Sequence, residues 1–243
     1  MTWTRVQDSP IQANNDDDTT ASPVFDNPTT AGNLVIFLGC IDKTSGNSTD
    51  WDGFTEIEDD DNTSNSILLG YIQTVGGETS WDITWATDQV NKSKLIEYSV
   101  SSGNTWAFDD SNVENSSNGV VSSQDTGSIT VANAGSLLVA GWSGDTATQV
   151  DNLPVVSGAG LTQLDIDVSN NGPIGGGPLL CYADNLNRAA GAAEGTYSCS
   201  DTGDQMSGVI AAFREIVGSG GDIILPQMMG HNLGANLFNG LIR

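Results

Sequence analysis

The sequence predicts an all-β protein with two tandem antiparallel β-sandwich units, jelly-roll or Ig-like in kind, and an extended C-terminal arm. Three observations support this prediction. Gly, Ser, Thr, Asn and Asp are abundant while Lys, Arg and Glu are scarce, which lowers helix propensity and supplies turn residues. Apolar segments are short, and several alternate with polar residues at the period of two that a half-buried strand requires. The same series of segments also occurs twice along the 243 residues.

The first repeated element is an apolar strand that follows a turn. Residues 31–39 read AGNLVIFLG, and residues 134–141 read AGSLLVAG. An alternating segment comes next in both copies, GFTEIE at 53–58 and GLTQLD at 160–165. The period of two predicts a strand with one face in the core.

Three further matches follow in the same order along both copies. They are LLGY at 68–71 with LLCY at 179–182, WDITW at 81–85 with GTYSC at 195–199, and KLIEY at 94–98 with GVIAAF at 208–213. The separation grows from 103 residues at the first match to 115 at the last, as expected when loops change length and strands are kept. Each copy is therefore predicted to form about six or seven short strands.

The repeat divides the chain into a first unit at 1–112 and a second unit at 113–217. The polar segment 103–127 joins them, and Trp106 and Phe108 predict that part of this segment packs onto a unit. The sequence leaves open whether the units are independent domains or pack as one pseudo-symmetric body.

The predicted C-terminal arm covers residues 218–243 and begins with the glycine-rich segment GSGG. It is richer in apolar residues than a solvated terminus, and its glycines disfavour a long helix. We therefore predict that it docks on another subunit; the alternative is that it folds back over its own second unit. The predicted docking residues are Ile223, Ile224, Leu225, Met228, Met229, Leu233, Leu237, Phe238 and Leu241.

The formal net charge of −24 comes from 31 acidic and 7 basic residues. Such a charge opposes binding to nucleic acid, and it suits a solvated surface, a cation or a basic protein partner. No stretch approaches the roughly 20 apolar residues of a membrane span, and the N-terminus lacks the apolar segment of a signal peptide. Nucleic acid and membranes are therefore not predicted partners.

The three cysteines, Cys40, Cys181 and Cys199, are too few for a disulfide framework and lack zinc-type spacing. Buried thiols are predicted. Cys181 and Cys199 lie in adjacent predicted strands, so one bridge between them is an alternative that leaves Cys40 unpaired.

Catalytic residues are not predicted, and neither is a cofactor. The single histidine, His231, lies in the arm, and residues 141–144 read GWSG without the strand–turn–helix context of a nucleophile elbow. A paired-carboxylate hydrolase is a third alternative, but most of the acidic residues lie in polar loops, where no burial raises a carboxyl pKa. We therefore expect no enzymatic activity.

Two acidic runs, at 16–18 and 56–62, offer oxygen ligands that suit Ca²⁺, but neither has a known calcium-loop spacing. Solvated turns are the favoured interpretation, and no metal site is predicted. Trp81 and Trp85 share one face of a predicted strand and are expected in the core. Trp51 lies in a predicted polar loop and is the candidate for ligand contact at the surface.

Several motifs together resemble a group of β-sandwich proteins. They are residues 4–7 (TRVQ), 31–36 (AGNLVI), 68–71 (LLGY), 96–99 (IEYS) and 128–131 (SITV), followed by the second copy, and they span residues 4–216. The series resembles proteins from tailed-bacteriophage structural gene neighbourhoods and bacterial surface proteins. This resemblance implies a virion component without catalytic residues, although the acidity and the arm of this chain depart from the group.

We therefore expect a non-enzymatic structural protein of a tailed-phage virion that decorates the capsid or joins a head or tail fibre complex through its arm. Its expected partners are major capsid, tail or portal subunits and further copies of itself, and its expected location is the virion, with the host cytoplasm during assembly. The alternative is an adhesin or carbohydrate-binding, receptor-binding module that recognises a host-surface glycan with its sandwich loops.

Overall fold

The computed structural model describes residues 2–42, 48–59, 65–115, 121–145, 155–167, 178–203 and 206–218. Within these ranges every regular element is a β-strand, and every strand pairing is antiparallel. The all-β prediction is therefore confirmed. The described ranges contain no helix with the length and apolarity needed to cross a lipid bilayer.

The first half of the chain forms one large sheet. Its strand order is β5 (Thr55–Asp59), β6 (Asn65–Gln73), β3 (Leu34–Asp42), β7 (Ile83–Ser99) and β1 (Thr4–Asp8), and β2 (Gln12–Ala21) and β4 (Ser48–Asp50) also pair with β7. The apolar strand β3 lies at the centre, as its unbroken run of buried residues requires.

The second half forms a large sheet and two small ones. The large sheet runs β13 (Thr162–Asp167), β14 (Pro178–Arg188), β11 (Ser136–Asp145), β17 (Met206–Ile216) and β8 (Thr105–Asn115). A three-stranded sheet contains β12 (Val155–Ser157), β16 (Thr196–Gly203) and β9 (Val121–Asp125), and β10 (Ile129–Val131) pairs with β15 (Gly191–Ala193).

The two large sheets have the same strand order. β13, β14, β11, β17 and β8 stand where β5, β6, β3, β7 and β1 stand in the first half. Four of the five repeated sequence motifs fall on these corresponding strands. The remaining motif falls on the start of β7 in the first half and on the separate strand β16 in the second, and β4 pairs with the start of β7 as β12 pairs with β16. We call residues that hold the same place in the two strand orders counterparts.

The irregularities of the two halves also correspond. The ladder between β5 and β6 has a bulge between Glu56 and Glu58, and the ladder between β13 and β14 has one between Gln163 and Asp165. Asp52 and Ala159 take positive φ angles of 46° and 49° in the turns just before β5 and β13. Positive φ at a non-glycine residue is uncommon, so its occurrence at both turns marks one shared backbone design.

The register shows one difference from the sequence matches. Phe37 of β3 pairs with Gly70, and its counterpart Ala140 pairs with Ala183. Gly70 therefore corresponds to Ala183 rather than to Cys181, which the LLGY and LLCY motifs had aligned. A slide of two residues keeps each side chain on the same face, so the hydrophobic pattern alone does not detect it.

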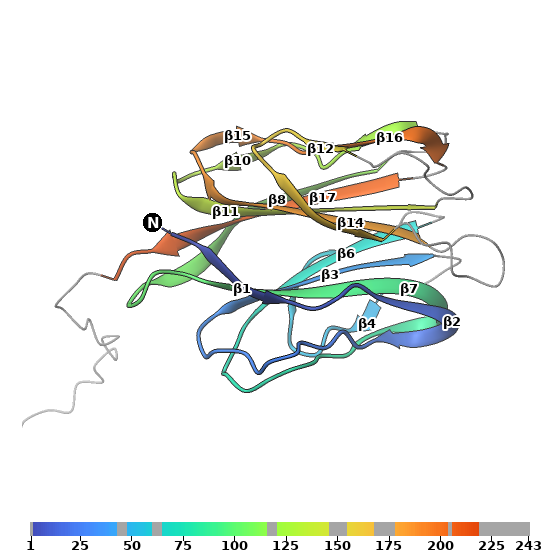
Figure 1. The fold of residues 1–243 in the computed structure, drawn as a ribbon, viewed down its shortest axis with the longest axis horizontal. Coiled ribbons are helices and arrows are strands. Elements are labelled where there is room, and N and C mark those ends of the chain that lie inside the picture. The colour runs from blue at the N-terminus through green and yellow to red at the C-terminus, as the bar shows by residue number, and fades with distance from the viewer. Residues whose placement is uncertain are drawn as a thin grey trace, which may run out of the picture.

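The sheets are stacked in layers (Figure 1). The two large sheets face each other across a shared core that contains residues of both halves, among them Leu34, Ile36, Leu38, Ile96, Leu137, Val139, Leu180 and Val209. A second core lies between the large sheet of the second half and its small sheets. A third core covers the outer face of β3 with aromatic rings from the first half. The two halves therefore pack through an interior of fully buried side chains.

The expected boundary between residues 112 and 113 falls inside β8. This strand pairs with β17 from Thr105 to Asn115, so all of it belongs to the large sheet of the second half. The chain passes from one large sheet to the other through residues 100–104, between β7 and β8. Trp106 and Phe108 pack against the shared core, in agreement with the expectation that this joining segment is packed.

Candidate functional site: a polar seam between the two large sheets

The two ends of the seam between the large sheets differ in chemistry. At one end Tyr71 of β6 meets Trp106, Phe108 and Phe213 from the second half. The Tyr71 and Phe108 rings are stacked with centroids 5.6 Å apart, and Phe213 lies edge-on to Tyr71 at 5.4 Å. The Trp106 indole completes this cluster and donates to the carbonyl of Gly32 at 3.0 Å. This end is an aromatic cluster in which Phe213 is fully buried and the other three side chains are half-buried.

At the other end the counterparts of these residues are polar. The strand pairings make Asp184 the counterpart of Tyr71, Arg5 the counterpart of Phe108, and Tyr98 the counterpart of Phe213. Arg5 Nε lies 3.9 Å from Asp184 Oδ2, and the Tyr98 hydroxyl donates to the same oxygen at 2.9 Å. The same three positions thus meet at both ends of the seam, with the roles of the two halves exchanged, as happens at a two-fold symmetric interface. The chain therefore breaks its internal symmetry where Arg5 meets Asp184.

Tyr182 and Lys94 extend the polar end inward. The hydroxyl groups of Tyr98 and Tyr182 are in hydrogen-bond contact, and both side chains are fully buried. Lys94 is only 1% exposed, and its Nζ lies 2.7 Å from Oδ2 of both Asp8 and Asp165. Because Asp165 belongs to the second half, this lysine joins strands β1 and β7 to β13. We call Arg5, Asp8, Lys94, Tyr98, Asp165, Tyr182 and Asp184 the polar seam.

Burial controls protonation in the polar seam. It raises the pKa of Asp184 to about 6, against 3.8 for a free carboxyl; the Arg5 charge acts in the opposite sense and Asp8 adds to the increase. Burial also raises the pKa of Tyr182 well above its usual value, and the Asp184 charge adds to this effect. A carboxyl group with a pKa near 6 changes charge close to neutral pH.

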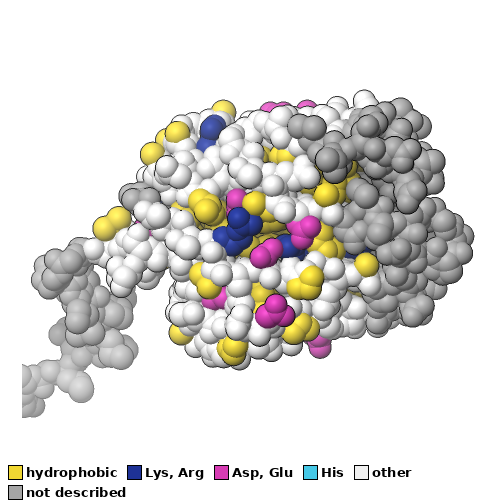
Figure 2. All heavy atoms as spheres, in the orientation of Figure 1, with side chains coloured by type: hydrophobic (Ala, Val, Ile, Leu, Met, Phe, Trp, Pro, Cys, Tyr) yellow, Lys and Arg dark blue, Asp and Glu magenta, His cyan; other side chains and the backbone are white. Residues whose placement is uncertain are grey.

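A cavity of about 340 Å³ opens beside Arg5 and Asp184. It is also lined by Gly160, Thr162, Leu164, Asn185, Leu186 and Asn187. Figure 2 shows basic and acidic side chains gathered in the middle of the face of the molecule that is turned to the viewer, where β1 and β14 lie in Figure 1. At the aromatic end, the counterparts of Arg5 and Asp184 are rings in mutual contact.

Two further buried carboxylates hold turns. Glu97 is fully buried and accepts hydrogen bonds from Gln7 Nε2 at 2.6 Å, from the Thr30 amide at 2.9 Å and from Asn33 Nδ2 at 2.6 Å. It thus fixes the turn before β3. Charge-assisted bonds of this kind are about twice as strong as neutral ones.

Glu215 holds the crossing between the two halves. It accepts from the Thr2 and Ser101 amides, both at 3.1 Å, and from Asn104 Nδ2 at 2.6 Å. Burial acts to raise the pKa of Glu215, but the bonds from Asn104 and Ser101 outweigh it, so the pKa is lowered. The ionised form is therefore the one that fixes residue 2 and the turn at 101–104.

The prediction that Trp51 is exposed is wrong. Its side chain is 9% exposed and lies edge-on to Phe37 at 6.0 Å in the third core. The turn at Asp52 folds the indole over Gly70, where an added Cβ would lie 2.8 Å from the ring. Trp81 and Trp85 are buried in the same core, as expected.

The alternative of a Cys181–Cys199 bridge is also wrong. Cys181 is a free, buried thiol whose pKa burial raises, and Cys40 is likewise buried and forms no disulfide. The strand of Cys181, β14, and the strand of Cys199, β16, belong to different sheets. β15 lies between the two strands in sequence, and they are not hydrogen-bonded to each other.

Other sequence candidates fall largely outside the described residues. His231 lies there, and so do the predicted docking residues Ile223, Ile224, Leu225, Met228, Met229, Leu233, Leu237, Phe238 and Leu241. Side chains of the acidic run at 16–18 and most of the run at 56–62 are not described either. Among the side chains that are described, no group of three or more His, Cys, Asp or Glu is placed to hold a metal ion.

Sequence reasoning missed the polar seam, although two signals pointed to it. Thr2-Trp3 and Thr105-Trp106 are separated by the same 103 residues as the first repeated strands, which makes Arg5 and Phe108 counterparts. Lys94 is one of only 7 basic residues and stands in an apolar strand. The two-residue slide of β14 hid Asp184, because the motifs aligned Tyr71 with Tyr182.

The Tyr98 hydroxyl is expected to stabilise the seam. Replacing Tyr98 with phenylalanine leaves the buried Asp184 carboxyl without this donor, so the free energy of unfolding should fall by about 1–3 kcal/mol in chemical denaturation. The matched control is Tyr71→Phe at the aromatic end, where we expect a change within about 0.5 kcal/mol. Equal effects of the two substitutions would contradict a structural role for the buried hydroxyl.

Comparison with known proteins gives no match: no protein-family model, no curated protein and no solved structure matches this chain. The resemblance to phage-associated sandwich proteins therefore stays a prediction from sequence motifs.

Proposed function

We propose that this chain is a non-enzymatic structural protein, built as two sandwich units fused face to face, and that it is a component of a tailed-phage virion. In this proposal it decorates the capsid or joins a head or tail complex through residues 218–243. The observation that supports this proposal is that its buried charged side chains bind other parts of the same chain. Lys94, Glu97 and Glu215 each bind two or three partners from separate strands or turns.

The engagement of these charged side chains within the fold favours a structural role. A catalytic acid or base acts on a substrate, so its reactive atom must be reachable and not already engaged by structural partners. Glu97 and Lys94 are at most 1% exposed, and their polar atoms are engaged within the fold. The contacts of Lys94 with Asp165, and of Glu215 with Thr2 and Ser101, join groups from both halves and hold the halves in one arrangement. A rigid body of this kind suits a particle component.

The net charge of −24 bears on the partner. A strongly acidic surface keeps the free protein apart from its own copies and attracts a basic surface on another protein. We therefore propose a basic patch on a capsid, tail or portal subunit as the receiving surface, with the apolar residues of the arm supplying the buried contact. The host cytoplasm is then the place of assembly.

Mass spectrometry of purified phage particles tests the proposal. We expect the full chain in stoichiometric amounts in intact particles, and its loss when residues 219–243 are replaced by a Gly/Ser segment of equal length. The control is the melting temperature of the two free proteins, which should agree. Absence of the full chain from particles contradicts the proposal, and a lower melting temperature of the altered chain shows that the arm packs on its own second unit.

A further inference from the structure

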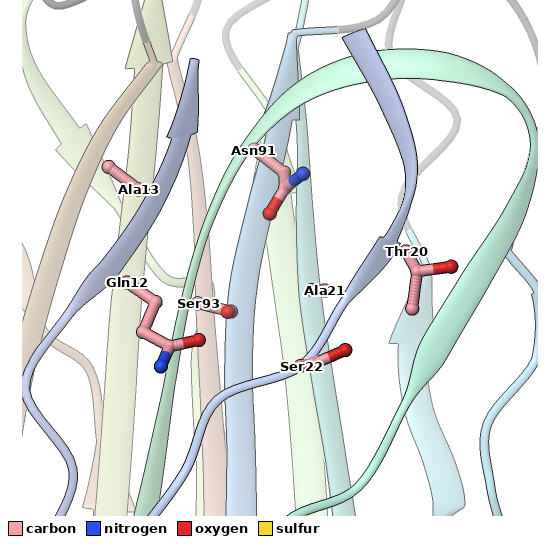
Figure 3. A pocket seen from close by; sticks show the side chains of 7 residues that line it. All are labelled: Gln12, Ala13, Thr20, Ala21, Ser22, Asn91 and Ser93. Atoms are coloured by element: carbon pink, nitrogen blue, oxygen red, sulfur yellow. The ribbon is translucent and has the colours of Figure 1, made fainter. Parts of the chain in front are cut away.

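A hollow of about 320 Å³ lies inside the first half, between β2 and β7. It is lined by Gln12, Ala13, Thr20, Ala21, Ser22, Asn91 and Ser93. In Figure 3 the side chains of Asn91 and Ser93 extend from β7 toward Ala21, the last residue of β2, and toward Ser22, which follows it, with Gln12 at one side. The volume falls at the lower end of the range of about 300–1,000 Å³ that is usual for small-molecule sites.

The second half fills the corresponding space with an indole ring. Gly39 pairs with Ser93 in the first half, and their counterparts Trp142 and Gly208 pair in the second. Trp142 is fully buried and donates to the carbonyl of Gln124 at 3.0 Å.

The residues around that indole have small or polar counterparts in the hollow. A Cβ on Gly208 would lie 2.9 Å from the Trp142 ring, so the ring occupies the space above that strand. The counterpart of Gly208 is Ser93, and the counterpart of Gln124 is Ala21, since these two pair with Tyr197 and Ile83 at matching places. Both Ser93 and Ala21 line the hollow. The space above Gly39 itself is taken by the Phe37 ring, which an added Cβ would approach to 2.9 Å, but no aromatic ring is among the described residues that line the hollow beside Ser93 and Ala21.

Ser93 supplies an independent indication of a ligand. The residue is 1% exposed, and its Oγ atom has no hydrogen-bond partner among the described residues. A buried hydroxyl without a partner costs about 1–3 kcal/mol, so such groups are rare unless something outside the chain completes them. The Ser93 hydroxyl lies on the wall of the hollow, where a bound molecule would complete it.

The chemistry of the wall defines the class of ligand. None of the seven described lining residues is charged, so these seven offer no ionic partner to a charged ligand. Three carry hydroxyl groups and two carry amides, which both donate and accept hydrogen bonds. We propose that this hollow binds a small neutral molecule rich in hydroxyl groups, of the size of a single sugar ring, with the Ser93 hydroxyl as one of its hydrogen-bond partners.

Saturation-transfer-difference NMR on the full chain tests this proposal with three probes. They are a mixture of neutral hexoses and N-acetylhexosamines, glucuronate as the anionic counterpart, and glucosamine as the cationic one. We expect saturation transfer to at least one neutral sugar and none above background to the two charged probes. Transfer to no neutral sugar, or equal transfer to a charged probe, overturns the proposal.

Two variants and one matched control locate the site. Ser93→Val removes the hydroxyl and places a methyl group in the hollow, and Gln12→Ala removes an amide at its edge without adding volume. We expect each to weaken binding about tenfold, the effect of one lost hydrogen bond. Thr162→Val makes the same kind of change beside the Arg5–Asp184 cavity and should leave binding unchanged. Binding that survives both hollow variants, with unchanged melting temperatures, overturns the proposal, as does binding that only Thr162→Val abolishes.

Discussion

Replacing Gly141 with leucine is expected to lower the free energy of unfolding by about 3 kcal/mol, the upper end of the usual cost of overpacking a core. Gly141 of β11 and its counterpart Leu38 of β3 meet at the centre of the shared core. A Cβ on Gly141 would lie 2.4 Å from Leu38 Cδ1, and Leu38 is fully buried. The two large sheets approach this closely because one of the two counterparts has no side chain. Urea denaturation of the single variant measures the effect.

A double-mutant cycle tests the reason for this cost. Leu38→Ala alone should destabilise by about 2–5 kcal/mol through the cavity that it leaves. In the double variant, the new leucine at position 141 fills the cavity that Leu38→Ala leaves in the opposite sheet. The double variant should therefore be more stable than the sum of the two single effects predicts. We expect a coupling of about 1–3 kcal/mol. Strict additivity would show that the two residues do not share one space at the centre of the seam.

The Asp184→Asn variant is expected to gain stability over the wild type as the pH rises from about 4 to about 7. The folded protein holds the pKa of Asp184 at about 6, above the free value of 3.8. Below pH 3.8 the Asp184 carboxyl is protonated in both the folded and the unfolded state, and its contribution to the free energy of unfolding is fully present. As pH rises through 6 that contribution is lost, because the folded state must then carry a buried charge. The difference between the two pKa values corresponds to about 3 kcal/mol.

Glu215→Gln provides a control of opposite sign. The pKa of Glu215 is lowered in the folded protein, so its contribution is present at neutral pH and is lost as the pH falls. Chemical denaturation of wild type, Asp184→Asn and Glu215→Gln at a series of pH values measures both differences. We expect the advantage of Asp184→Asn to grow with pH and the deficit of Glu215→Gln to shrink on acidification. A pH-independent difference for Asp184→Asn would contradict its assigned protonation.

The sequence predicted those features that depend on local pattern. Period-two alternation placed residues 53–58 and 160–165 on strands, and the structure has β5 and β13 there. Trp81 and Trp85 were predicted to be buried because alternation puts them on the same face as Ile83, and all three lie in one core. Such predictions succeed because a strand exposes and buries alternate side chains whatever surrounds it.

The errors share a different cause. Trp51 follows a polar segment, and its burial depends on the positive φ of Asp52 and on the empty space above Gly70. Neither is visible in a hydrophobic pattern. Asp184 was overlooked because a slide of two residues preserves every buried face while it changes which side chains are counterparts.

The sequence alone determined that the chain is all-β and that one order of strand motifs is written twice. Only the tertiary structure decided how the copies meet, through a seam with rings at one end and Arg5, Tyr98 and Asp184 at the other. It also decided that Ser93 lines a hollow while its counterpart Gly208 is covered by the Trp142 indole. The reason is physical. Strand formation depends on neighbours along the chain, whereas a buried charge or a cavity is created by side chains that approach from distant strands, and no local pattern records that approach.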